Sequence, residues 1–85
     1  KLDKNISIYP NPTKGIVNIK FNDTWRGDVN FEITDIFGRS INERILDNKS
    51  ASSSHSIDIS NSNDGLYIIQ LVQGDKKTMH KVIKE

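Results

Sequence analysis

The chain has 85 residues, a length that allows one domain. Its formal net charge of +1 gives no electrostatic reason to expect nucleic-acid binding, and the lack of cysteine excludes disulfides and thiolate metal sites. Hydrophobic residues make up 34% of the chain, enough for a folded core, but the longest apolar run, Leu66–Ile69, is too short to span a membrane. Because the sequence begins with Lys1 rather than Met, we expect it to be a piece of a longer protein.

A stretch with two prolines, Ile8–Gly15, organises the N-terminal part of the sequence. Pro10 and Pro12 are the only prolines of the chain. Each fixes its own φ and favours extended conformations in the residue before it. The four residues from Asn11 match a type I turn, and Gly15 follows where a positive φ is needed. We therefore expect a stiff corner that joins two strands and keeps an edge strand from pairing with other chains.

Alternating apolar and polar residues predict seven short strands. They cover residues 6–9, 16–21, 29–34, 39–47, 57–59, 66–73 and 76–84. The sixth is apolar on both faces, so we expect it in the centre of its sheet. In the fourth, Glu43 shares one face with Ile41 and Ile45, which indicates either a β-bulge or a strand at a sheet edge.

The connections between these strands carry turn chemistry. Trp25 lies in a polar loop after the second strand, where we expect it to cap one end of the core rather than bind a ligand. The residues Asp35–Gly38 predict the turn of a β-hairpin, because a short loop that ends in Gly suits that geometry. Gly74 turns the chain into the last strand, and Asn48–Ser54 is expected to be the most mobile loop.

This pattern favours an all-β fold, an antiparallel β-sandwich of about seven short strands. The strands recur at roughly 8–12-residue spacing, and no 3.6-residue period predicts a helix. A small closed barrel of the oligonucleotide-binding type is the alternative, but it has five longer strands and usually a helix.

The polar residues do not predict an enzyme or a cofactor site. His55 lies between two serines and three residues before Asp58, but neighbours in a strand point to opposite faces and cannot form a triad. The residues Asn61–Asp64 faintly resemble a calcium loop, which would need a glutamate where Val72 stands. We expect His80, among lysines on the last strand, to be a solvated surface residue.

Three blocks of the sequence form a pattern that spans nearly the whole chain. The first, Tyr9–Gly15, reads Tyr-Pro-Asn-Pro-Thr-x-Gly. The second is Ile33–Arg39, and the third is Ile57–Ser60 followed by Gly65–Tyr67 and Lys81–Ile83. In this order the blocks resemble the C-terminal sorting domain of cargo proteins of the type IX secretion system, the Por secretion system type A sorting domain family. The second block looks like the central hairpin of that family.

The resemblance implies a single immunoglobulin-like domain over residues 1–85, carried at the C-terminus of a larger secreted protein. It implies that the cargo crosses the inner membrane of a Gram-negative bacterium of the Bacteroidetes type and is then exported across the outer membrane. The type IX translocon would recognise the folded domain, and a sortase-like peptidase would remove it. The cargo would be secreted or attached to the cell surface, and the domain would need neither a cofactor nor nucleic acid.

The residues that match the family's motifs are expected to set backbone turns for the most part. They are Tyr9, Pro10, Asn11, Pro12, Gly15, Asp35, Gly38, Gly65, Leu66, Tyr67 and Gly74. Three basic residues, Arg39, Lys81 and Lys84, are the candidate contacts with the translocon.

Two other functions remain as alternatives to a sorting signal. A carbohydrate-binding or adhesive sandwich appended to a secreted enzyme would present exposed aromatic side chains, for which only Trp25 and Tyr67 are suitable. A purely structural spacer would be dispensable for export.

Overall fold

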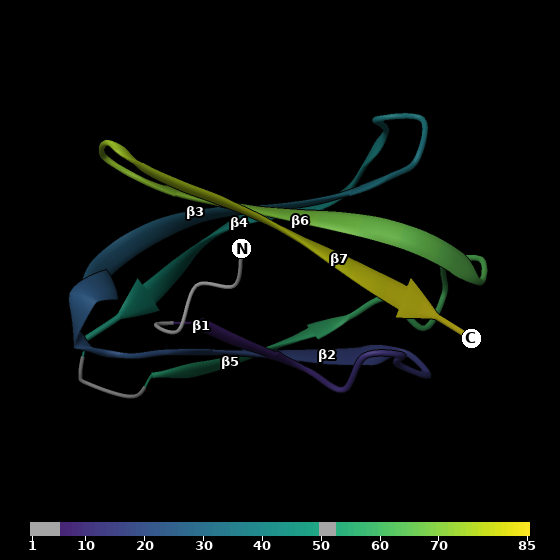
Figure 1. The fold of residues 1–85 in the computed structure, drawn as a ribbon, viewed down its shortest axis with the longest axis horizontal. Coiled ribbons are helices and arrows are strands. Elements are labelled where there is room, and N and C mark those ends of the chain that lie inside the picture. Colours follow the sequence, from purple (N-terminus) through teal and green to yellow (C-terminus); the bar gives the residue numbers. More distant parts are fainter. Residues whose placement is uncertain (1–5, 50–52) are drawn as a thin grey trace.

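The computed structural model describes residues 6–49 and 53–85, which form two antiparallel sheets packed face to face (Figure 1). The strands are β1 (Ile6–Tyr9), β2 (Ile16–Phe21), β3 (Gly27–Asp35), β4 (Ser40–Asn48), β5 (Ser54–Asp58), β6 (Gly65–Gln73) and β7 (Lys76–Lys84). One short 3-10 helix, η1 (Asp23–Trp25), lies between β2 and β3, where the sequence predicted only a loop. The loop expected to be most mobile falls partly on residues 50–52, which lie outside the described residues.

The first sheet has the order β1-β2-β5 and the second has the order β4-β3-β6-β7. This is an immunoglobulin-like arrangement in which the fourth strand pairs with the third. The prediction of an all-β antiparallel sandwich of seven strands is therefore confirmed, and the barrel alternative is wrong. β6 lies between β3 and β7, as its apolar sequence predicted.

The core lies between the two sheets and is built from the alternate positions of the strands. Its fully buried side chains include Val17, Ile19, Phe21, Val29, Phe31, Ile33, Ile57, Ile69, Leu71 and Val82. Trp25 is 2% exposed and its ring packs against that of Phe21, with 5.9 Å between the centroids. The expectation that Trp25 caps one end of the core is confirmed.

The inward face of β4 differs from the expected one. Ile41 and Ile45 are exposed and point outward, whereas Leu46 is buried. The reason is the register with β3, because Leu46 lies opposite the buried Val29 and opposite residues share a face. β4 is both an edge strand and irregular, since the register shifts at Ile33. Of the two readings of Glu43 left open by the sequence, the edge strand applies, because Glu43 lies in regular register opposite Glu32 and the irregularity lies nearer the start of β4.

Candidate recognition surface

The proline-bounded corner lies along the C-terminal half of β7. The side-chain amide of Asn11 donates from Nδ2 to the carbonyl oxygen of Lys81, and its Oδ1 accepts the backbone N–H of Ile83, both at 2.9 Å. The peptide bonds that precede Pro10 and Pro12 are both cis. Because an amide side chain carries one donor group and one acceptor, Asn11 acts here as one more residue of a strand beside β7.

Thr13 continues this pairing through its own backbone. Its N–H donates to the oxygen of Ile83 at 2.8 Å, and its oxygen accepts the N–H of Glu85 at 3.0 Å, which makes a parallel bridge with Lys84. Its hydroxyl, on a residue that is 1% exposed, donates to the oxygen of Ile16 at 2.5 Å. The extended pairing of Thr13 means that the expected type I turn is wrong.

Gly15 is the position where the corner comes closest to the rest of the chain. Its φ is +155°, and a Cβ atom there would lie 2.9 Å from the Cβ of Ser60. Its carbonyl oxygen accepts the N–H of Ile59 at 2.7 Å. The expected positive φ is confirmed, and the close approach to Ser60 adds a second reason for glycine.

The turn between β3 and β4 is held by the side chain of Asp35. Its Oδ1 accepts the backbone N–H groups of Phe37 and Arg39 at 2.9 and 3.0 Å, and its Oδ2 accepts from Arg39 Nε at 2.7 Å. Desolvation raises the pKa of this carboxyl, but the hydrogen bonds from Arg39 and Phe37 outweigh it, so the pKa is lowered. Gly38 closes the turn at a φ of +84°, as the hairpin prediction requires.

The start of β6 completes the same end of the sandwich. Gly65 pairs with Lys84, and Tyr67 lies opposite Asp35 on β3. The hydroxyl of Tyr67, whose ring is buried, donates to the carbonyl oxygen of Asn63. This segment therefore connects the hairpin tip, on one side, to the last residues of β7, on the other.

Most of the motif residues thus meet at one end of the sandwich, which we call the motif end. It consists of the proline corner (residues 9–15), the β3–β4 tip (residues 35–39), the segment 61–67 and the end of β7 from Lys81. In Figure 1 these parts gather at the end of the sandwich where the C-terminus lies. Gly74, in the β6–β7 turn, lies at the opposite end.

The three basic candidates are placed differently. Arg39 has a side chain that is 75% exposed, and Lys81 is also exposed. Lys84 is 8% exposed, and its Nζ lies 2.9 Å from Oδ1 of Asp64. Lys84 therefore stabilises the motif end itself, while contact of any of the three with a partner stays a prediction.

The sequence reasoning missed the most exposed part of the motif end. Ile36 and Phe37, at the β3–β4 tip, are 62% and 78% exposed. From the sequence, both residues are expected in the turn of the hairpin, and neither is a candidate contact with the translocon. The signal was present, because two consecutive large apolar residues are unusual in a turn, where polar residues and glycine predominate.

The histidines do not form a catalytic group with the neighbouring serines. His55 Nε2 lies 2.6 Å from Oδ1 of the buried Asn48, and the Nδ2 of Asn48 donates to the oxygen of Trp25. Since this fixes Oδ1 as an acceptor, His55 donates from Nε2. His80 is half-buried, contrary to the expected solvated position, and its Nε2 lies 3.0 Å from Thr78 Oγ1.

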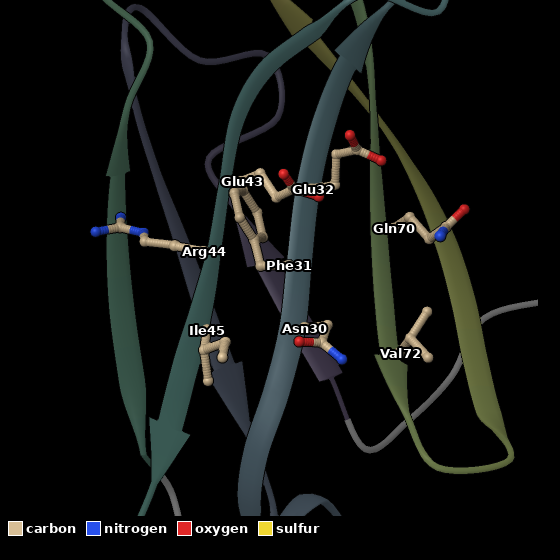
Figure 2. Close-up of a pocket in the computed structure, with 8 residues that line it drawn as sticks. All are labelled: Asn30, Phe31, Glu32, Glu43, Arg44, Ile45, Gln70 and Val72. Carbon is tan, nitrogen blue, oxygen red and sulfur yellow. The ribbon is translucent and has the colours of Figure 1, made fainter.

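An open hollow lies on the outward face of the second sheet, away from the motif end (Figure 2). Glu32 and Glu43 lie directly opposite each other there, on β3 and β4. Arg44 points away from them toward β5, where it donates to the oxygen of Ser56 at 2.8 Å. The hollow contains no nucleophile paired with a base. In residues 6–49 and 53–85, no group of three or more acidic, histidine or cysteine side chains could hold a metal ion.

The two aromatic residues that a carbohydrate platform would need are buried. Trp25 is 2% exposed and Tyr67 is 4% exposed. Their rings do not form an exposed face for a sugar, so a carbohydrate-binding platform built on these two residues is wrong. No helix in the described part of the chain is long and apolar enough to cross a membrane.

The chain is thus a small antiparallel β-sandwich whose motif residues gather mostly at one end. The family described as the secretion system C-terminal sorting domain matches residues 7–85. The chain belongs to this family, the C-terminal sorting domains of type IX secretion. No curated protein sequence matches the chain. The family is one of sorting signals rather than of catalysts, and it implies export to the cell surface or secretion.

Proposed function

We propose that the type IX outer-membrane translocon recognises this chain as a folded domain, at its motif end, and thereby exports the cargo to which it is attached. The cargo reaches the periplasm of a Gram-negative bacterium of the Bacteroidetes type before this step. A sortase-like peptidase then removes the domain. Membership of the sorting-domain family supports this proposal.

The observation that carries the proposal is the convergence of motif residues that are far apart in the sequence. Asn11 and Ile83 are 72 positions apart but share a hydrogen bond. Asp35 on β3 pairs with Tyr67 on the neighbouring strand β6. An unfolded chain would not present these residues together. Recognition of this surface therefore requires a folded domain.

The experiment is a transfer of the signal to an unrelated protein. The chain is attached to the C-terminus of a reporter with its own inner-membrane export signal, in a host with a type IX system. We expect the reporter in the medium or at the cell surface, and in the periplasm when the chain is omitted. A fusion that is folded but stays in the periplasm, or that is exported without the translocon, would contradict the proposal.

A further inference from the structure

We propose that the β3–β4 tip, formed by Ile36, Phe37 and Arg39, is the anchor by which the domain seats in an apolar, acid-rimmed pocket of the type IX translocon. This inference rests on the proposed function, because it assigns the contact surface within the motif end. Ile36 and Phe37, which the sequence places in a turn, thereby become contact residues.

The side chains of Ile36 and Phe37 are largely exposed. Phe37 is 78% exposed and Ile36 is 62% exposed, at a loop that projects beyond the sheets (Figure 1). A hairpin turn does not need apolar side chains, since polar residues and glycine satisfy its backbone better. Neither residue packs against the core cluster. An exposed aromatic side chain in a small domain is the usual form of an anchor residue at a protein interface.

Hydrogen bonds order the backbone of the tip before any partner binds. The carboxylate of Asp35 accepts three hydrogen bonds, from the backbone of Phe37 and from the backbone and Nε of Arg39. Two backbone bonds close the same turn, from Gly38 to Asp35 and from Asp35 to Arg39. A loop whose backbone is already ordered loses less conformational entropy on binding. This network therefore favours tight seating of Phe37.

The positive charge of Arg39 indicates the chemistry of the pocket. The guanidinium carbon of Arg39 lies 5.6 Å from the centroid of the Phe37 ring, so the cation stands over the aromatic face. Asp35 accepts a hydrogen bond from Nε of Arg39, but the side chain of Arg39 remains 75% exposed. A guanidinium has five donors in a planar fork that matches carboxylates. The fitting partner is thus an apolar pocket with acidic residues at its rim.

An open hollow beside the tip extends this surface. It is lined by Asp35, Arg39, Asn61, Ser62, Asn63 and Tyr67, among others. Its walls present amide, hydroxyl and carboxylate groups on two separate segments of the motif end. A partner that receives Phe37 can place polar groups of its pocket rim in this hollow. The projecting tip and the neighbouring hollow together form one contact surface.

A protein partner fits this surface better than a lipid surface does. Membrane attachment by a short apolar loop needs support from several basic residues, whereas Arg39 is the single basic residue of the tip and the chain carries a net charge of only +1. We therefore assign the tip to a pocket in the translocon.

The test compares two double variants of a cargo that carries this domain. In the first, Ile36→Ser and Phe37→Ser remove the anchor. In the second, Ile45→Ser and Met79→Ser remove apolar side chains of similar exposure, 62% and 59%, from the outward face of the second sheet. Binding to purified, detergent-solubilised translocon and export from cells are measured for both. Asp35→Asn tests the preorganisation with the apolar residues retained.

We expect the tip variant to bind the translocon at least about tenfold more weakly and the control variant to bind as the original does. Asp35→Asn should bind more weakly than the original but better than the tip variant. A photo-crosslinker placed at position 37 should label the translocon in cells that express the full cargo.

Several results would overturn the inference. If deletion of the whole domain blocks export but the tip variant binds and exports normally, the anchor assignment is wrong while the proposed function stands. If deletion leaves export intact, the proposed function itself fails. Binding of the chain to phosphatidylethanolamine–phosphatidylglycerol vesicles through Phe37, without crosslinking to the translocon, would replace the protein pocket by a lipid surface.

Discussion

Asn11 accepts the backbone N–H of Ile83 at 2.9 Å, although 72 positions separate the two residues. The same amide donates to Lys81, so one side chain satisfies both a donor and an acceptor along the edge of β7. The proline corner thereby closes half of an edge that would otherwise be open to pairing with another chain. The first and last motif blocks are consequently one structural unit.

The first prediction concerns this pairing. Asn11→Ala should lower the free energy of unfolding by about 1–2 kcal/mol, because two hydrogen bonds are lost at a partly solvated edge. Asn11→Asp is the matched control, since its carboxylate still accepts the N–H of Ile83 but no longer donates to Lys81. Urea unfolding should place Asp between Asn and Ala. Equal stability of all three proteins would contradict the structural role of the amide.

Gly15 allows a second test that separates backbone strain from crowding. Gly15→Ala combines an unfavourable φ with a Cβ that would lie 2.9 Å from Ser60 Cβ. Gly65→Ala has nearly the same φ, +149°, but its Cβ would meet nothing within 4 Å. We expect a loss of about 1–3 kcal/mol at Gly65 from backbone strain and about 1–3 kcal/mol more at Gly15 from crowding. A Gly15 variant as stable as the Gly65 variant would show that the corner has room to move.

The basic residues of β7 give a third prediction. Lys81→Glu should change stability by no more than about 0.5 kcal/mol, because the side chain is exposed. Lys84→Glu should lower stability by about 2–4 kcal/mol, because it places a carboxylate beside Asp64 in a largely buried position. Thermal or urea unfolding measures both.

Export then distinguishes contact from folding at these two lysines. Loss of export by the folded Lys81→Glu variant would support a translocon contact. A fully active Lys81→Glu variant would remove Lys81 from the contact surface. For Lys84, we expect any loss of export to follow the loss of folded domain, and export should return when Asp64→Lys restores the ion pair in the opposite sense.

The fourth prediction is a pH dependence that involves His55. Burial lowers the pKa of this imidazole below its usual 6.5, and Arg44 lowers it further, while Asp47 acts in the opposite direction. The folded state therefore binds the proton more weakly than the unfolded state does. Stability should be full above pH 6.5, fall as the pH drops through that value, and level off below the lowered pKa.

His55→Gln is the control for this titration, because glutamine can still donate to Asn48 but does not ionise. The variant should lose the part of the pH dependence that begins at about pH 6.5 and continues as the pH falls. Urea unfolding across this range measures it. An unchanged pH profile in the variant would assign the effect to other groups.

The sequence predicted which segments form strands better than it predicted which face of each strand points inward. The alternation in β3, and the apolar run of β6, were sufficient because each pattern is local to one strand. β4 was misread because Ile41 and Ile45 are apolar and outward. Only the pairing of Leu46 with Val29 decides which face is inward.

The motif end was predictable as a set of turns but not as a surface. No local pattern pairs Asn11 with β7, because that contact joins segments at opposite ends of the chain. Lys84 reads as a solvated end residue, yet its burial follows from the bridge with Thr13 and the ion pair with Asp64. The two adjacent apolar residues in the β3–β4 turn are a signal in the sequence, but only the structure shows that Phe37 lies outside the core.

The most direct test of the account is the intact mass of the mature parent protein, recovered from the medium and from the cell surface. If the domain is a sorting signal that is removed after export, the mass lacks the 85 residues, and deletion of the domain leaves the precursor in the periplasm. Two results together would contradict this function: a mature protein that retains all 85 residues, and a deletion variant without the domain that is exported equally well.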